Sequence, residues 1–399
     1  AASHTGPSAR LVCMQRVHIA PRPNLERTAI EHGFELDEAG GVRHWDESVY
    51  YRFTMRQIED DIERCGEDIE AMCHEFLNRA VADDTIFRRL CIPESYWNYI
   101  AESWRGRQKD LYGRMDFSYD GLGDAKLLEY NADTPTTLYE SSEFQWLWLE
   151  QAAAMDLIPK ESDQFNELYE HLLKAFASLG VVGLLHLACI EEIEDDKGTV
   201  DYLEECARDA GLETRFIAMK DIGIDLQGRF TDLEDEVIST MFKLYPWEWI
   251  MDEDFARYLP TNGVQFLEPP WKAVLANKGL LPFLWEMFEG HPSLLPSYFE
   301  GDPRAADLSP NFVRKPLLSR QGWNVEIHGG EDPASYRDGP YGDEGYIVQA
   351  FHPLPDFDGA YPLVGCWMVA GRSAGLCIRE DRNLVTSVDA RFVPHVILD

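Results

Sequence analysis

The stretch 111–140 constrains the fold of this chain more than any other. It holds two strand-like runs, 114–119 and 126–130, separated by the sequence DGLGD. Glycine and aspartate dominate this connection, and such a composition is typical of the turn in a β-hairpin. The sequence therefore predicts that these two runs pair as neighbouring strands.

The predicted hairpin carries polar side chains on one face. Alternate residues of a strand share a face, so Arg114 and Asp116 point the same way. Glu129 and Asn131 do the same on the second run. Two carboxylates and an amide are oxygen ligands that suit Mg2+ bridging phosphates, and a fixed arginine suits charge on a transferring phosphoryl group. The alternative is a solvated hairpin with ordinary salt bridges.

The loop that follows the hairpin has the composition of a ligand-binding segment. Its sequence, NADTPTTLYESS, places hydroxyl and amide side chains around a proline. Hydroxyls and free backbone N–H groups on such a loop can hold a ligand against a rigid scaffold.

Charge and hydropathy exclude several classes of protein. The chain has 71 acidic and 36 basic residues, a net charge of −35, which repels nucleic acid and anionic membranes and favours a cationic partner or substrate. An alternative is that the acidity serves solubility or a salt-adapted host. With 45% hydrophobic residues the chain is not disordered, and none of its apolar runs approaches the roughly 18–20 residues of a membrane span.

The eight cysteines and the N-terminus indicate a cytoplasmic protein. The cysteines lack CxxC spacing, which argues against a disulfide framework or a zinc site and favours reduced thiols. The N-terminus lacks the pattern of a secretory signal. We expect residues 1–13 to be a leader outside the fold, with Met14 as the native start.

The middle of the chain changes from helix to alternating strand and helix. Long helical patterns, the clearest at 54–80, give way to an apolar run at 181–190, an acidic loop at 191–196, a helix from about 199 to 210 and a strand at 213–218. This order predicts a small parallel sheet with acids at the carboxyl end of its first strand, where α/β sheets bind ligands.

Several cationic or amide side chains lie on separate predicted elements of the last third of the chain, namely Lys278, Lys315, Gln349 and Arg379. A lysine within an apolar strand is costly unless it meets an anion, and phosphate is a natural partner. Isolated structural ion pairs are the alternative. The chain has no GxxxxGK[ST], kinase or GxSxG motif. If it uses ATP, it must bind it through a site other than a P-loop or a protein-kinase fold.

With these residues in view, the chain resembles the glutathionylspermidine synthase family from about residue 14 to 399, most closely its short members that lack the amidase domain and are described as acid–amine ligases. The matching segments are YGRMDFSYDG, LLEYNADTPTTLYES, FKLYPWEW, FLEPPWKAVLANKGLLPFLW, VRKPLLSRQGWNV, YIVQAFHPLP and GLCIREDRNLV. The resemblance implies an α/β (α+β) chain with an ATP-grasp fold, formed by 14–160 and 240–399. A small parallel, pre-ATP-grasp-like unit is expected at about 161–239.

The resemblance also implies a role for each site residue. Arg114 would stabilise the transition state and contact ATP. The ligands of two Mg2+ ions would be Asp116, Glu129 and Asn131. The further ATP-binding residues would be Lys278 and Lys315 at the phosphates, Gly322 in a covering loop, Gln349 near the adenine, and Arg379 near the phosphates. The substrates would be held by Thr134, Thr136 and Glu192.

The expected activity is an ATP- and Mg2+-dependent ligation of a carboxylic acid and an amine through an acyl phosphate. A glutathione-like peptide and a polyamine are the candidate substrates. Leu244 replaces a family threonine linked to substrate handling, so the acid and the amine stay open, as does the oligomeric state. The alternatives are an inactive nucleotide- or polyamine-binding sensor or subunit, and a hydrolase that uses Asp116 and Glu129.

Overall fold

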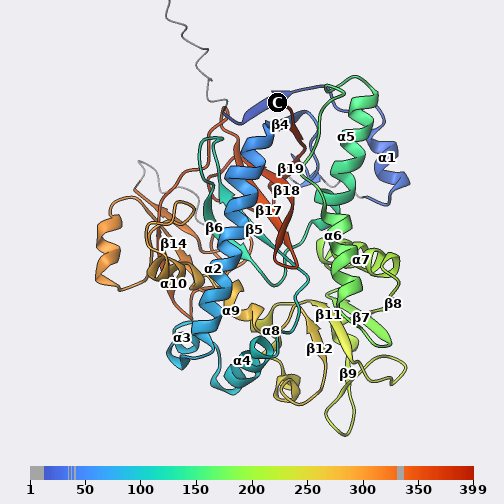
Figure 1. Cartoon of the computed structure of the whole chain (residues 1–399), viewed down its shortest axis with the longest axis vertical. Coiled ribbons are helices and arrows are strands. Elements are labelled where there is room, and N and C mark those ends of the chain that lie inside the picture. The colour runs from blue at the N-terminus through green and yellow to red at the C-terminus, as the bar shows by residue number, and fades with distance from the viewer. Residues whose placement is uncertain (1–12, 35, 37, 40–41, 330–336) are drawn as a thin grey trace, which may run out of the picture.

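A five-stranded antiparallel sheet forms the centre of the computed structural model, which describes residues 13–34, 36, 38–39, 42–329 and 337–399 (Figure 1). The leader expected at 1–13 therefore falls almost wholly outside the described residues. The strand order is β19-β18-β17-β5-β6. The bounds are β5 (Tyr112–Ser118), β6 (Lys126–Asn131), β17 (Tyr361–Val369), β18 (Arg372–Asp381) and β19 (Arg391–Val393).

One face of this central sheet is covered by a long helix. A π-helical segment, Gln57–Glu63, runs directly into α2 (Arg64–Ala80), and both lie within the predicted helix 54–80. The predicted apolar positions of this helix are all buried: Ile58, Ile62, Ile69, Met72, Phe76 and Leu77. They share a core with Met115, Cys366 and Met368 of the sheet, so α2 packs on the face opposite to Arg114 and Asp116.

The other face of the sheet packs on a second core. This core includes Trp367 and Tyr112 of the sheet together with apolar residues of α5 (Gln145–Ala154) and α6 (Leu168–Ser178). The helices that complete the N-terminal half are α1 (Leu25–Glu31), α3 (Asp84–Arg89) and α4 (Trp97–Arg105). A small sheet of β1 (Gln15–His18), β4 (Val49–Phe53) and β20 (His395–Ile397) joins the two ends of the described chain.

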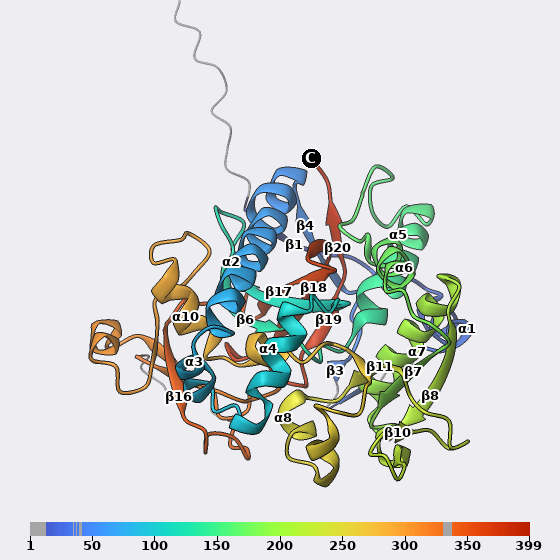
Figure 2. The ribbon, with the colours of Figure 1, turned by 60° about the horizontal axis from the view of Figure 1, so that its bottom comes forward.

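A four-stranded parallel sheet lies on one side of the central sheet (Figures 1 and 2). Its order is β12-β11-β7-β8, with bounds β7 (Leu184–Cys189), β8 (Glu213–Ala218), β11 (Thr240–Leu244) and β12 (Gln265–Leu267). Helix α7 (Glu194–Asp209) connects β7 to β8, which confirms the predicted strand–helix–strand unit. The expected boundary at 239 stays a prediction, but the sheet also takes β11 and β12 from beyond it.

A second four-stranded sheet lies on the opposite side, in orange in Figure 1. Its order is β13-β16-β14-β15, with bounds β13 (Ser297–Phe299), β14 (Phe312–Pro316), β15 (Glu326–His328) and β16 (Tyr346–Ala350). The nearby helices are α9 (Lys272–Ala276) and α10 (Leu280–Met287), and α8 (Trp247–Ile250) follows β11. The chain is therefore a mixed α/β protein, as predicted.

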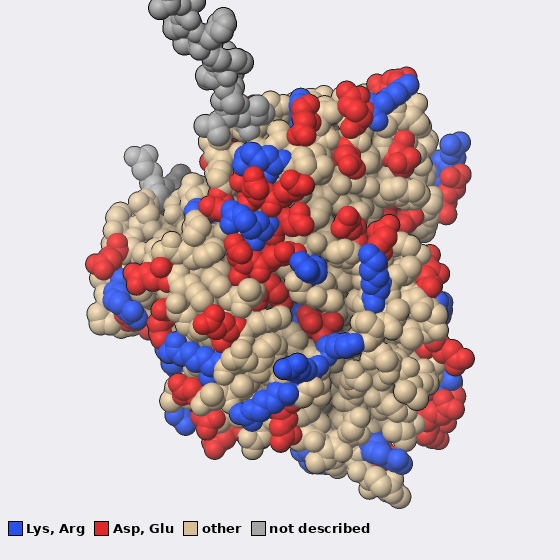
Figure 3. Space-filling view, viewed as in Figure 1, with Lys and Arg blue, Asp and Glu red and all other residues tan. Residues whose placement is uncertain are grey.

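The surface visible in Figure 3 is rich in acidic side chains, as expected from 71 acidic and 36 basic residues. Acidic side chains are spread over the face that α2 covers, with basic side chains between them (Figure 3). All eight cysteines are unpaired. Along the described part of the chain, every helix is too short or too polar to cross a membrane.

Candidate active site

The predicted hairpin is present and places its polar residues side by side. Strands β5 and β6 pair antiparallel, with Arg114 opposite Asn131 and Asp116 opposite Glu129. The turn between them contains Gly121 and Gly123, both at positive φ, as a tight connection requires. The four side chains named from the sequence therefore line one strip of a single sheet.

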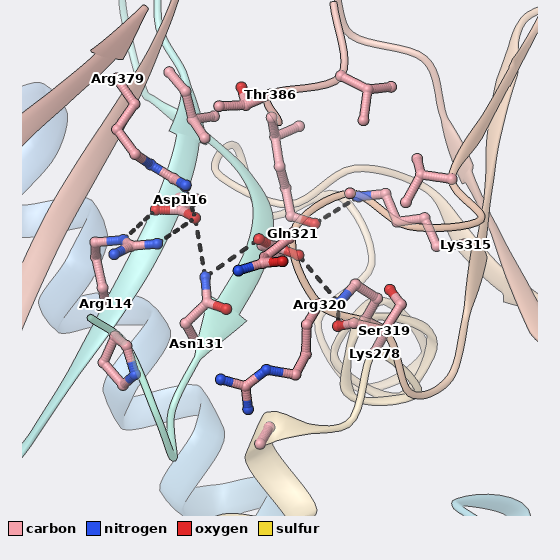
Figure 4. A pocket seen from close by; sticks show the side chains of 18 of the residues that line it. Arg114, Asp116, Asn131, Lys278, Lys315, Ser319, Arg320, Gln321, Arg379 and Thr386 are labelled. Carbon is pink, nitrogen blue, oxygen red and sulfur yellow. Dashed lines mark hydrogen bonds and ion pairs between the residues drawn. The ribbon is translucent and has the colours of Figure 1, made fainter. Parts of the chain in front are cut away.

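Asp116 is the most enclosed member of this strip. Its side chain is fully buried and accepts hydrogen bonds from Arg114 Nε at 2.8 Å, Arg379 Nη2 at 2.7 Å and Asn131 Nδ2 at 2.9 Å (Figure 4). Two guanidinium groups thus converge on one buried carboxylate. Such charge-assisted bonds fix both arginines in direction.

Glu129 lies beside two lysines. Its Oε2 is 3.2 Å from Lys278 Nζ, and its Oε1 accepts a hydrogen bond from Asn131 Nδ2 at 3.2 Å. Burial acts to raise the pKa of Glu129, but the charges of Lys278, Lys315 and Arg379 outweigh it and hold the pKa below its ordinary value. Glu129 is therefore a stable anion among cations.

Lys315 reaches this strip from β14. Its Nζ donates to the carbonyl oxygen of Leu128 and to Gln349 Oε1, each at 2.7 Å. Gln349 in turn donates to the carbonyl oxygen of Leu127 at 3.2 Å. Burial lowers the pKa of Lys315 to about 8. Gln349 therefore holds Lys315 in place through its side-chain carbonyl oxygen. The role of Gln349 near an adenine stays a prediction.

All these side chains border one cavity between the central sheet and the two flanking sheets. Of the predicted site residues, the cavity lining includes Arg114, Asp116, Glu129, Asn131, Thr134, Thr136, Lys278, Lys315, Gly322, Gln349 and Arg379. These residues come from distant parts of the chain. The fold therefore brings together every predicted site residue except Glu192.

The loop that contains Gly322 closes against this cavity. Gly322 has φ +72°, and a Cβ there would lie 2.9 Å from the carbonyl oxygen of Thr386. Lys278 Nζ donates to the carbonyl oxygen of Ser319 at 2.9 Å. Arg320 Nη1 donates to Thr134 Oγ1 at 2.8 Å, so the loop contacts the segment after β6.

Glu192 lies elsewhere, because the local structure differs from the predicted loop. Helix α7 begins at Glu194 rather than near residue 199, so the acids at 194–196 form its first turn, where the helix dipole favours negative charge. Glu192 pairs with Lys220 outside the cavity, and the cavity is lined by Asp195 and Asp196 instead. Burial raises the pKa of Asp196 to about 6.

Sequence reasoning also missed Arg320 and Glu248, which line the cavity. Arg320 lies two residues before Gly322, and a cation next to a glycine in a covering loop was an available signal. Leu244 is buried in the core and is not among the described residues that line the cavity, so its side chain is not part of the wall.

The predicted magnesium ligands fit the ion by chemistry. Asp116, Glu129 and Asn131 supply carboxylate and amide oxygens from adjacent strands. The Nδ2 of Asn131 bonds to both carboxylates, which turns its Oδ1 away from them. Within the described ranges, three or more His, Cys, Asp or Glu side chains do not gather in a metal-binding group. An ion held here would therefore need oxygens from other ligands as well, as is usual for Mg2+.

Comparisons with known proteins assign the chain to a family. A family model described as "Glutathionylspermidine synthase preATP-grasp" matches residues 16–398. A Haemophilus influenzae protein named "Putative acid--amine ligase" is 39% identical over 96% of this chain and 99% of its own length. Trypanothione synthetase of Crithidia fasciculata is 28% identical over 86% of this chain, and the bifunctional glutathionylspermidine synthetase/amidase of Escherichia coli is 26% identical over 90%. The matches span only 57% and 61% of those two longer proteins.

Proposed function

The chain belongs to the glutathionylspermidine synthase family, and on that premise we propose that it is a ligase that joins a carboxylic acid to an amine at the expense of ATP. The observation that supports this most is the gathering of four cations around two carboxylates and an amide in one cavity. The cations are Arg114, Arg379, Lys278 and Lys315. Within a chain of net charge −35, this cluster of four cations and two carboxylates has an excess of positive charge, which is suited to a polyanion such as ATP.

The reaction proceeds in two steps. A carboxylate oxygen of the acid attacks the γ-phosphorus of ATP, the bond to the β-phosphate oxygen breaks, and ADP leaves. An amine nitrogen then attacks the acyl carbon, loses a proton, and expels inorganic phosphate to leave the amide. Each step moves negative charge onto oxygens that preorganised donors can stabilise.

The two lysines and the two arginines have different parts in this scheme. Lys278, between α9 and α10, and Lys315 of β14 hold the phosphates of ATP. Arg114 and Arg379, fixed by Asp116, point their remaining N–H groups at the phosphoryl group in transfer. The ATP-grasp fold of the family is the frame for these contacts, and the segment around Gly322 covers the nucleotide.

Magnesium would be held by Asp116, Glu129 and Asn131. When bound, the ion neutralises phosphate charge and aligns the γ-phosphoryl group. Glu129 suits this role because its depressed pKa keeps it ionised.

The two substrates occupy different parts of the lining. The amine, a diamine or polyamine, lies near Asp195, Asp196 and Glu248, where carboxyl groups attract a cation. The acid, a glutathione-like peptide, lies near Thr134 and Thr136, whose hydroxyls and backbone can hold a peptide. The free thiols support a cytoplasmic setting.

The two-carboxylate hydrolase fits less well. Such an enzyme needs one carboxyl group that stays protonated to donate a proton. Asp116 is bound to two arginines, and nearby cations hold the pKa of Glu129 below its ordinary value. Neither is suited to donate a proton.

The test is phosphate release from ATP and Mg2+ with a panel of acids and amines, including glutathione and spermidine. We expect turnover that requires one acid and one amine together, and a product whose mass is their sum less water. Tight ATP binding without turnover in any combination would favour the sensor. Turnover of ATP that ignores both substrates would contradict the ligase.

A further inference from the structure

Strand β17 forms the floor beneath Arg114. It lies between β5 and β18 in the central sheet, with Trp367 opposite Arg114 and Gly365 opposite Asp116. On its other side Gly365 is opposite Cys377 of β18. Side chains at these positions project on the face that carries the cavity, so each is a neighbour of the arginine.

Trp367 supports the guanidinium through its ring. The Cζ atom of Arg114 lies 5.3 Å from the centre of the indole, within the range of a cation–π contact. Trp367 is fully buried, and its ring stacks on Tyr112 with 6.0 Å between centroids. Among the described residues its Nε1 has no hydrogen-bond partner. The indole therefore contributes a flat, electron-rich surface rather than a polar atom.

Gly365 keeps the space that the arginine side chain occupies. A Cβ at this position would lie 2.5 Å from Cys377 Sγ and 3.0 Å from Arg114 Cδ. It would also lie 3.3 Å from Asp116 Oδ1. The first distance is too short for any contact, and the second is tighter than nearly all real ones. Gly365 lies within a regular strand, so the requirement here is for room rather than for an unusual backbone angle.

We propose that Gly365 and Trp367 are positioning residues that set the direction of Arg114 for catalysis. Because Gly365 has no side chain, the aliphatic part of the Arg114 side chain can lie close to the sheet. The ring of Trp367 supports the guanidinium of Arg114 in the position where it bonds to Asp116. This inference rests on the proposed function only for its kinetic consequence. The geometric claim stands on the contacts of Arg114 alone.

The kinetic test compares Gly365→Ala, Trp367→Leu and Trp367→Phe with the unaltered enzyme, using MgATP and the acid–amine pair that supports turnover. We expect Gly365→Ala and Trp367→Leu to lower kcat at least tenfold with KM for ATP within about twofold, because small misplacements of a catalytic group are costly. Trp367→Phe keeps an aromatic face and should retain most of kcat.

Two controls match these changes. Trp148 is also fully buried, also has an Nε1 without a partner in the described part of the chain, and packs in the same core as Trp367. Its ring lies next to Tyr50, whereas the ring of Trp367 lies under Arg114. Cys366 adjoins Gly365 on the opposite face of β17. Trp148→Phe and Cys366→Ala should leave kcat unchanged, even where they lower the melting temperature.

A double-variant cycle separates positioning from a general structural effect. If Gly365 acts through Arg114, adding Gly365→Ala to Arg114→Ala should reduce kcat by less than twofold further. A full tenfold additional loss would overturn the inference. So would a Gly365→Ala enzyme with normal kcat.

Crystal structures of the unaltered protein and Gly365→Ala keep this result separate from the proposed function. We expect the guanidinium of Arg114 to move and its bond to Asp116 Oδ1 to lengthen. If the protein proves to have no ligase activity, a displaced Arg114 still supports the positioning role, and an unmoved Arg114 overturns it.

Discussion

The planar guanidinium of Arg114 donates hydrogen bonds from all three of its nitrogens, so its shape matters as well as its charge. Its Nε donates to Asp116 Oδ1 at 2.8 Å and its Nη2 to Oδ2 at 3.3 Å, while Nη1 donates to the carbonyl oxygen of Thr136 at 3.2 Å. Lysine carries the same charge on a single nitrogen and cannot reproduce these three bonds. The direction of the group therefore depends on its shape.

We expect Arg114→Ala to lower kcat by about 10²–10³, equivalent to roughly 2.7–4 kcal/mol of barrier, by analogy with the loss of one preorganised donor. Arg114→Lys should recover less than a tenth of the lost rate. The measurement is phosphate release, with circular dichroism to show that both variants fold. Near-normal turnover in Arg114→Lys would mean that charge alone suffices.

His395 makes the stability of the protein depend on pH. Its side chain is buried, and Nε2 accepts a hydrogen bond from the backbone N–H of Phe165 at 3.2 Å. Burial lowers the pKa of His395 from 6.5 to about 3. The unfolded chain therefore binds a proton below pH 6.5 that the folded protein does not, and folding free energy is lost as the pH falls through this range.

Lowering the pH from 8 to 5 should reduce the free energy of unfolding by about 2 kcal/mol through His395 alone. Urea denaturation of the unaltered protein and His395→Gln at the two pH values measures it. Only the difference between the two proteins isolates His395, because Asp196, whose pKa is raised, acts in the opposite direction. His32→Gln, at an exposed position, is the control and should behave like the unaltered protein. Identical pH dependence in His395→Gln would refute the assignment.

At the scale of elements, one buried ion pair joins the segment after β6 to the parallel sheet. Lys243 Nζ of β11 lies 2.7 Å from Asp133 Oδ1, and both side chains are almost completely buried. Asp133 Oδ2 accepts from the backbone N–H of Trp247, and Lys243 lies over the ring of that tryptophan. Asp133 also lines the cavity. This pair therefore ties the wall of the site to the neighbouring sheet.

Lys243→Met should destabilise the protein by about 3–5 kcal/mol, because it leaves a buried carboxylate without its partner. Adding Asp133→Asn, which can still accept from Trp247, should restore most of this loss. The measurement is chemical denaturation. The exposed pair of Lys160 and Asp156 provides a control, and Lys160→Met should change stability little. A Lys243→Met protein as stable as that control would refute the argument.

Elements with strong local signals could be predicted from the sequence. The hairpin of β5 and β6 has turn residues between runs of period two, and the strands β16 and β17 are largely apolar runs with clear ends. The start of α7 could not be placed, because its first-turn acids resemble a loop until the helix dipole is considered. That error also concealed which acids face the cavity, since a helical turn and a loop point them differently.

At the scale of the whole molecule, the site depends on pairings that the local sequence does not encode. Lys315 meets the carbonyl oxygen of Leu128 across 187 positions of the chain, and Arg379 meets Asp116 across 263. Residue chemistry alone indicated phosphate for the scattered lysines, and only the family resemblance grouped them with the hairpin. Gly365 and Trp367 belong to no recognisable sequence motif. Their importance depends on how closely they approach Arg114, which only the folded structure shows.

Because the cavity wall is assembled from so many separate segments, its ligand should stabilise the entire fold. A ligand at 100 times its Kd adds about 2.7 kcal/mol to the free energy of unfolding. We therefore expect MgATP to raise the melting temperature by a few degrees in a thermal scan, and EDTA to remove most of that rise.

Lys315→Met should abolish the rise in melting temperature, since this lysine lies beside Glu129 within the cavity wall. Lys220→Met is the matched control, because Lys220 pairs with Glu191 and Glu192 outside the cavity, and its response to MgATP should be intact. An equal rise in both variants would mean that ATP binds elsewhere. A rise that EDTA leaves unchanged would mean that Asp116, Glu129 and Asn131 hold no ion in the complex.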